Sequence, residues 1–283
     1  LGIMIDRLSD FCSSLCTWNY TGGRGTKNTF ARQALPMVWD FAETNPFNEI
    51  GANWVACIKA ARSTIRKLPE GLPSVVERGS ATSLPYENAT LDVVVTDPPY
   101  YDNVAYADLS DYFYVWLKRS IGFLYPQHFS SALTPKKREA VADATRYEGD
   151  RQHAARVYER MMAQAFGEAG RVLKPGAPLV IVYAHKTTLG WATLVDALRV
   201  AGFTVTEAWP LDTERSARIR AIDTASLASS IFLVARRREG KATGSYEREV
   251  RPDLQRIVRE RVERLWAQGV TGADLVIACV GAG

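Results

Sequence analysis

The stretch "VVVTDPPYYDN", residues 93–103, places an aspartate and two prolines directly after three valines and a threonine. A run of β-branched residues that ends in turn-forming residues predicts a buried strand. Pro98 and Pro99 fix φ and have no backbone N–H, so they hold the next turn without leaving a donor unsatisfied. The carboxylate of Asp97 and the carbonyl oxygen of Pro98 can then act together as hydrogen-bond acceptors.

Two adjacent acceptors suit an amino group that carries two hydrogens. Tyr100 adds an aromatic face on which a planar ring can stack, and Tyr101 is a second candidate for that role. The alternative is that Asp-Pro-Pro is only a turn that leaves a strand, with the tyrosines serving to pack. The strand before the turn and the aromatic residues after it favour a binding site for an aromatic amine.

The rest of the chain predicts the fold around this strand. Apolar, β-branched runs predict strands at 74–79, 91–96, 178–183, 204–209 and 230–237, and helical spacing predicts helices at 151–173, 191–202 and 253–267. Alternating strands and helices indicate a doubly wound α/β fold, in which a parallel sheet is covered on both faces. The last two strands are separated only by a loop and could add an antiparallel edge. Ligands of such sheets bind beyond the carboxyl ends of the strands, where Asp97 lies.

Composition narrows the class of protein. The 283 residues are 47% hydrophobic and 23% charged, which is enough for one sizeable core with appendages. A net charge of +4 is compatible with a polyanionic partner without requiring one. The cysteines have neither paired spacing nor a disulfide framework, which predicts reduced thiols in a cytoplasmic protein and argues against a metal site; they are Cys12, Cys16, Cys57 and Cys279. No apolar run is long enough to span a bilayer, so no membrane partner is expected.

The run Asp97-Pro98-Pro99-Tyr100 resembles the catalytic motif of the amino-methyltransferases, which transfer a methyl group from S-adenosylmethionine to the exocyclic amine of adenine or cytosine in DNA. The longer runs at 96–120, 32–47 and 173–188 are similar to those of prokaryotic adenine-specific DNA methylases that carry an N-terminal domain of unknown function. This resemblance covers nearly the whole chain. Some RNA methyltransferases share the four-residue motif, and protein-glutamine methyltransferases use an Asn-Pro-Pro-Tyr version.

The resemblance implies the Rossmann-like sheet of a class I S-adenosylmethionine-dependent methyltransferase, and it implies a set of site residues. The expected catalytic residues are Asp97, Pro98, Pro99 and Tyr100. The expected substrate contacts are Tyr101, Asn103, His185 and Lys186, the last two following a predicted strand in a His-Lys pair that the family also carries. Cofactor contacts are expected from Ser80, Ala81 and Asp97. Family members often have an aspartate in place of Ser80, near the cofactor's adenine.

The domain organisation follows from the same comparison. We expect residues 1–68 to form a helical insertion before the third strand, 69–238 the DPPY half of the catalytic core, and 239–283 a C-terminal helical extension. The Gly-rich loop that holds the methionine end of the cofactor in this family is not visible upstream of residue 74. The chain also begins inside an apolar helical pattern and ends without a polar tail. These features predict a segment of a longer protein, whose upstream residues complete the cofactor site.

A charged connector, residues 133–151, is expected at the active-site face, with Lys136, Lys137 and Arg138 placed to meet phosphate. A solvated loop is an equally good interpretation. The function expected from the sequence is methylation of adenine in DNA. Three alternatives remain: a cytosine 4-amino DNA methylase, an RNA or protein-amide methyltransferase of the same fold, and a non-catalytic nucleic-acid-binding subunit.

Overall fold

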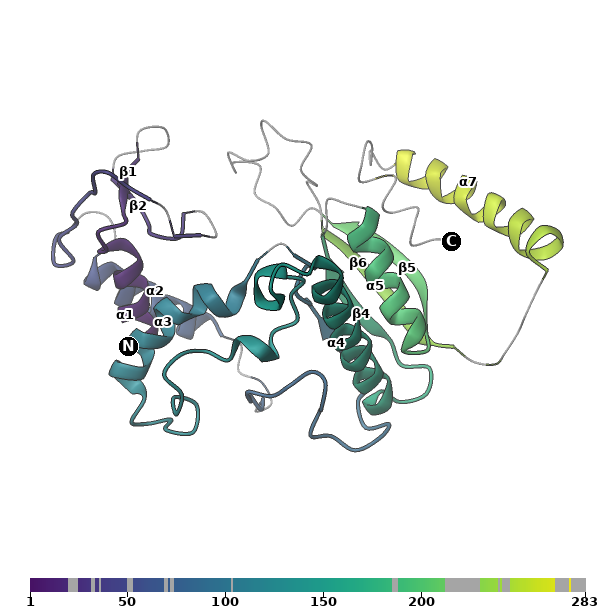
Figure 1. Cartoon of the computed structure of the whole chain (residues 1–283), viewed down its shortest axis with the longest axis horizontal. Coiled ribbons are helices and arrows are strands. Elements are labelled where there is room, and N and C mark those ends of the chain that lie inside the picture. Colours follow the sequence, from purple (N-terminus) through teal and green to yellow (C-terminus); the bar gives the residue numbers. More distant parts are fainter. Residues whose placement is uncertain are drawn as a thin grey trace. The chain divides into compact units, whose positions relative to one another are not determined.

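The structure is a computed structural model. It describes residues 1–19, 25–31, 34–35, 37–49, 53–68, 71, 74–102, 104–184, 188–211, 230–238, 240, 245–267 and 275. The chain divides into two compact units: unit 1 contains residues 1–76 and 104–139, and unit 2 contains residues 77–103 and 140–283. Each unit is therefore built from two separate stretches of chain (Figure 1). This division assigns residues 104–139 to the same unit as the N-terminal segment.

Unit 1 is mainly helical. Its elements are α1 (Gly2–Phe11), the two-stranded antiparallel pair β1 (Thr17–Trp18) and β2 (Thr26–Lys27), α2 (Trp54–Lys67), α3 (Tyr106–Ile121) and the 3-10 turn η1 (Lys136–Arg138). Helix α1 packs against both α2 and α3. The hydroxyl of Tyr112 in α3 donates to the carbonyl oxygen of Ser9 in α1 at 2.7 Å, which ties the two helices together.

Unit 2 is built on a four-stranded mixed sheet. Its strands are β3 (Val94–Thr96), β4 (Leu179–Tyr183), β5 (Phe203–Leu211) and β6 (Ser230–Arg237), in the order β3-β4-β6-β5. Strand β3 runs parallel to β4, and β6 runs antiparallel to both β4 and β5. The helical elements are η2 (Ala144–Tyr147), α4 (Arg151–Val172), α5 (Thr188–Val200), the π-helical turn η3 (Tyr246–Val250) and α7 (Arg251–Ala267). This helix-flanked mixed sheet is of the Rossmann-like α/β class predicted from the sequence.

The core of unit 2 follows from the period of two along β4 and β6. Alternate residues of β4 pair with alternate residues of β6, and all six are at most 1% exposed: Leu179, Ile181 and Tyr183 with Ala235, Leu233 and Ile231. Helix α4 adds side chains at helical spacing, namely Tyr158, Met162, Phe166 and Ala169, and α5 adds Leu194 and Leu198. Helices α4 and α5 contact each other and lie side by side across the sheet (Figure 1).

The strands predicted at 178–183, 204–209 and 230–237 are confirmed, and the strand predicted at 91–96 is present in a shorter form. The strand predicted at 74–79 is wrong, because no strand forms there and Val75 and Val76 are 77% and 92% exposed. Their β-branched side chains favour a strand only where a neighbouring strand and a packed face are available. Antiparallel pairing of the last two strands is confirmed, although β6 lies inside the sheet and β5 forms its edge.

The predicted helices form with ends that local chemistry explains. Asp150 caps α4 by accepting from the backbone N–H of His153 at 2.9 Å, and the helix ends before the sequence Lys174-Pro175-Gly176. Gly202, with φ of 81°, supplies the left-handed residue after α5. None of the helices in the described ranges is long and apolar enough to cross a bilayer.

Candidate active-site loop after β3

Asp97 lies immediately beyond β3, at the carboxyl end of the strand. In the β3–β4 ladder Thr96 pairs with Ile181, so the parallel strands end at the same edge of the sheet, near Tyr183. The side chain of Asp97 is exposed, whereas Pro98 is buried and Pro99 is half-buried. The two prolines thus lie against unit 2, whereas the carboxylate remains accessible from solvent.

Tyr158 of α4 holds the loop that follows Asp97. Its hydroxyl donates to the carbonyl oxygen of Pro99 at 2.8 Å and accepts from the backbone N–H of Tyr101 at 3.3 Å. The side chain is 1% exposed, and burial raises the pKa of this hydroxyl, so it stays protonated and able to donate. Tyr101 has a φ of 44°, a left-handed conformation that costs a non-glycine residue on the order of 1 kcal/mol or more. The bonds to Tyr158 help to stabilise this conformation.

Aromatic rings meet edge to face around the loop. The centroids of Tyr100 and Tyr183 are 5.1 Å apart with an interplanar angle of 75°, and those of Tyr101 and Tyr158 are 5.2 Å apart at 85°. Tyr183 makes a similar contact with Trp191 at 5.1 Å and 88°. Edge-to-face contacts of this kind are favourable and restrict ring orientation. The ring of Tyr100 is therefore positioned by the core rather than rotating freely.

The two predicted acceptors remain open. Within the described ranges, neither the carboxylate of Asp97 nor the carbonyl oxygen of Pro98 forms a hydrogen bond, whereas the carbonyl oxygen of Pro99 is used by Tyr158. A loop held by its second proline thus presents the oxygens of the two preceding residues. This arrangement can accept two hydrogen bonds from one amino group.

The other predicted site residues either have no described hydrogen bond to the loop or lie outside the described residues. Ser80 and Ala81 are exposed, and the hydroxyl of Ser80 accepts from the backbone N–H of Thr82 at 3.3 Å within its own turn. No hydrogen bond joins either residue to 97–101 in the part of the chain that is described. Asn103, His185 and Lys186 lie outside the described residues. Cys12, Cys16 and Cys57 are free thiols, and Cys279 is also outside the described residues.

Sequence reasoning missed the side chains that hold the segment leading into β3. The guanidinium of Arg171 in α4 donates to the carbonyl oxygens of Leu84 and Tyr86 at 3.0 and 2.8 Å. It also pairs with Glu168 at 2.8 Å, and Glu168 accepts from the backbone N–H of Leu84 at 2.9 Å. The spacing of a Glu and an Arg three residues apart on a helix could have predicted their ion pair. That spacing does not predict the distant segment that the pair binds.

The Glu168–Arg171 pair predicts an acid-sensitive stability. Hydrogen bonds from Arg171, and then from the backbone of Leu84, lower the pKa of Glu168 to about 2 from its usual 4.5. A carboxyl whose pKa is lower in the folded state stabilises the fold above pH 4.5, and this stabilisation is lost as pH falls from about 4.5 to 2. Replacing Glu168 with glutamine should therefore flatten the decrease in melting temperature over that range. Melting curves at half-unit pH steps test this, and an identical pH dependence in both proteins would contradict it.

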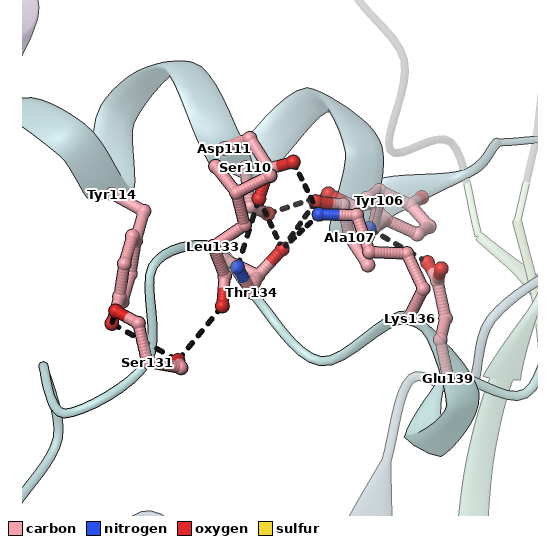
Figure 2. Close-up of polar contacts among 10 residues, drawn as sticks. All are labelled: Tyr106, Ala107, Ser110, Asp111, Tyr114, Ser131, Leu133, Thr134, Lys136 and Glu139. Atoms are coloured by element: carbon pink, nitrogen blue, oxygen red, sulfur yellow. Dashed lines mark hydrogen bonds and ion pairs between the residues drawn. The ribbon is translucent and has the colours of Figure 1, made fainter.

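In the charged connector, an ion pair of Lys136 bears on the expected phosphate contact of that residue. Figure 2 shows the ammonium group of Lys136 against the carboxylate of Asp111 in α3, with Thr134 bonded to the same carboxylate. Burial alone would raise the pKa of Asp111, but hydrogen bonds from Lys136 and Thr134 hold that pKa below its usual value. The prediction that Lys136 meets phosphate is thus not supported, because its charge is neutralised within unit 1. Lys137 and Arg138 are exposed.

No protein-family model and no curated protein matches the chain. Among solved structures, a "putative DNA modification methylase" of Thermus thermophilus is 18% identical over 66% of this chain and 62% of its own, with a TM-score of 0.29. The same protein complexed with S-adenosyl-L-methionine is 16% identical over 66% and 61%, with a TM-score of 0.31.

An S-adenosylmethionine-dependent methyltransferase of Methanosarcina mazei is 12% identical over 64% of this chain and 77% of its own, with a TM-score of 0.29. The chain thus spans about three fifths of the length of the Thermus protein that it resembles. Overlaps this low support no inference about activity, so the function of this chain has to be argued from its own residues.

Proposed function

We propose that the chain is the substrate-binding part of an S-adenosylmethionine-dependent methyltransferase that methylates the exocyclic amine of adenine in DNA. The main support is the loop after β3, where two open acceptors, from Asp97 and Pro98, stand beside the positioned ring of Tyr100. The loop lies at the carboxyl end of the sheet, where ligands of α/β folds bind. The resemblance of Asp97-Pro98-Pro99-Tyr100 to the amino-methyltransferase motif suggests the reaction that this loop would serve, which is methyl transfer to an exocyclic amine.

Each residue of the loop then has a definite task. Adenine inside a duplex presents its amine to the partner base, so the nucleotide must be rotated out of the stack before it can reach the loop. The ring of Tyr100 stacks on the base, and Asp97 and Pro98 accept the two N–H groups of its amine. These bonds orient the nitrogen lone pair towards the methyl donor, and an ionised acceptor makes a stronger bond than a neutral one.

S-adenosylmethionine, when bound, supplies a methyl group on a positively charged sulfur. The proposal includes Ser80 and Ala81, which are exposed in the turn before β3, as the residues that would border its adenine. Asp97 is an anionic neighbour for the sulfonium charge. We include in the proposal that residues upstream of this chain hold the methionine end of the cofactor.

Methyl transfer with the full-length protein tests the proposal. Duplex DNA, RNA and a protein mixture are each incubated with labelled S-adenosylmethionine, and nucleosides from labelled DNA are separated to tell N6-methyladenine from N4-methylcytosine. Label in N6-methyladenine is the expected result. Label in cytosine, RNA or protein would select the corresponding alternative, which has the same pair of acceptors. DNA binding without any label would favour a non-catalytic subunit.

Substitution of Tyr100 separates stacking from hydrogen bonding. Tyr100→Ala removes the ring, and the loss of one stacked base contact corresponds to about 1–3 kcal/mol, or roughly 5- to 150-fold in kcat/KM. Tyr100→Phe keeps the ring and is expected to be mild. Tyr86→Ala, which removes an exposed tyrosine ring elsewhere in unit 2, is the control and should have near wild-type activity. Equal impairment of the Ala and Phe variants of Tyr100 would assign the role to its hydroxyl instead.

A further inference from the structure

Helix α2 of unit 1 has a charge composition that the catalytic site does not explain. Its 14 residues include four basic side chains and no acidic one: Lys59, Arg62, Arg66 and Lys67. All four are exposed. The helix is secured at its start by Asn53, whose side chain accepts from the backbone N–H of Ala56 at 2.7 Å. The charges therefore belong to a well-capped helix.

Three of these charges form a stripe. At about 100° per residue, Lys59, Arg62 and Arg66 lie within an arc of about 60° on the helix surface. Cys57, which is 3% exposed, and the half-buried Ala61 mark the face that packs, and this face lies about 150° away from the stripe. The stripe thus points away from the packed side of α2.

The described part of the chain places no acidic partner on the stripe. Within the described residues, no ion pair or hydrogen bond of these four side chains is found. Two arginines of α7 behave differently: Arg251 pairs with Glu247, and Arg256 pairs with Asp253 and Glu260. Like charges three and four residues apart destabilise a helix. Arg66 and Lys67 lie in the last turn, where cations interact favourably with the helix dipole, but Lys59 and Arg62 gain nothing there.

We propose that this stripe of α2 binds the phosphate backbone of duplex DNA. Residues 59 to 66 extend about 10 Å along the helix axis, which matches about three nucleotides of one strand at about 3.4 Å each. Guanidinium groups suit phosphate because they donate in a planar fork. The choice of DNA over RNA rests on the proposed function, whereas the phosphate chemistry rests on α2 itself.

The test compares two full-length variants with the same change in charge. One carries Lys59→Gln, Arg62→Gln and Arg66→Gln; the control carries Arg251→Gln, Arg256→Gln and Arg264→Gln on α7. Binding to a fluorescein-labelled DNA duplex is followed by anisotropy between 50 and 200 mM KCl, without any methyl donor. Loss of three phosphate contacts should reduce the slope of log K against log salt by about 3 in the α2 variant. Between 50 and 200 mM KCl, the fold-decrease in the binding constant should therefore be roughly 40 times smaller for the α2 variant than for wild type.

The control variant should bind with nearly the wild-type slope, and melting curves should show that both variants fold. An unchanged slope in the α2 variant would overturn the proposal, as would an equal decrease in the α7 control. A change seen with duplex RNA and absent with DNA would also overturn it. Because the binding assay contains no methyl donor, its result does not depend on methylation. The DNA-binding proposal can therefore be judged even if the proposed methylation is not found.

Discussion

Replacement of Asp97 by alanine is expected to reduce methyl transfer to DNA by about 10²- to 10³-fold, the usual effect of removing a group that stabilises charge in a transition state. The substitution deletes one of the two open acceptors and the only charged one. Asp97→Asn should keep part of the activity, because its carbonyl oxygen still accepts a hydrogen bond. Folding should be little affected, since the side chain is exposed and forms no hydrogen bond within the described part of the chain.

Labelled-methyl incorporation into duplex DNA, with melting curves recorded in parallel, measures both effects. Asp102→Ala is a suitable control, because Asp102 is also an exposed aspartate of the same loop. Wild-type rates for Asp97→Ala would reject the catalytic interpretation of the loop. A large fall in melting temperature would make Asp97 a structural residue.

Tyr158→Phe is expected to lower the free energy of unfolding by about 1–3 kcal/mol, because it removes two hydrogen bonds of about 0.5–1.5 kcal/mol each, to the carbonyl oxygen of Pro99 and from the N–H of Tyr101. These two backbone groups keep only their bond to each other, at 3.2 Å. The ring and its contact with Tyr101 are kept, so the loss is confined to one oxygen. Methyl transfer should fall as well, because the loop that carries Asp97 is no longer held to α4. Urea unfolding gives the first quantity and single-turnover methylation gives the second.

Tyr112→Phe provides the matched control, since its hydroxyl donates to the carbonyl of Ser9 inside unit 1. It should cost about 0.5–1.5 kcal/mol of unfolding free energy and leave methyl transfer near wild type. If the two variants lowered methylation equally, the effect of Tyr158 would be one of general stability. Loss of activity in Tyr158→Phe alone would identify it as a positioning residue for the loop.

The sequence predicted those features of unit 2 that depend on local chemistry. The apolar runs of β4 and β6, the stop at Lys174-Pro175-Gly176 and the accessible aspartate after β3 can each be inferred from a few adjacent residues. The wrong strand at 74–79 had the correct local composition, but no strand of the described residues pairs with Val75 or Val76. Local propensity alone did not distinguish these two cases.

The candidate site shows the same division. The open acceptors of Asp97 and Pro98 followed from the two prolines, which act on their immediate neighbours. Tyr158 lies 59 residues from Pro99, and Glu168 lies 84 residues from Leu84, so no short pattern could pair them. The ion pair of Lys136 was missed for the same reason, since its partner Asp111 comes from another helix 25 residues away.

The position of β6 has a consequence for how the chain acquires its structure. In the described sheet β6 separates β4 from β5, and the ladder that β5 forms is with β6. During synthesis β5 therefore leaves the ribosome before β6, the strand that will pair with it. The apolar residues of β5 stay unpaired until β6 has been made. Pairings between distant segments form slowly, because closing the intervening loop costs entropy before any contact repays it. Completion of the sheet is thus delayed until Arg237 has been made, and a nascent chain that stalls earlier exposes the inner edge of β4 to other unpaired strands.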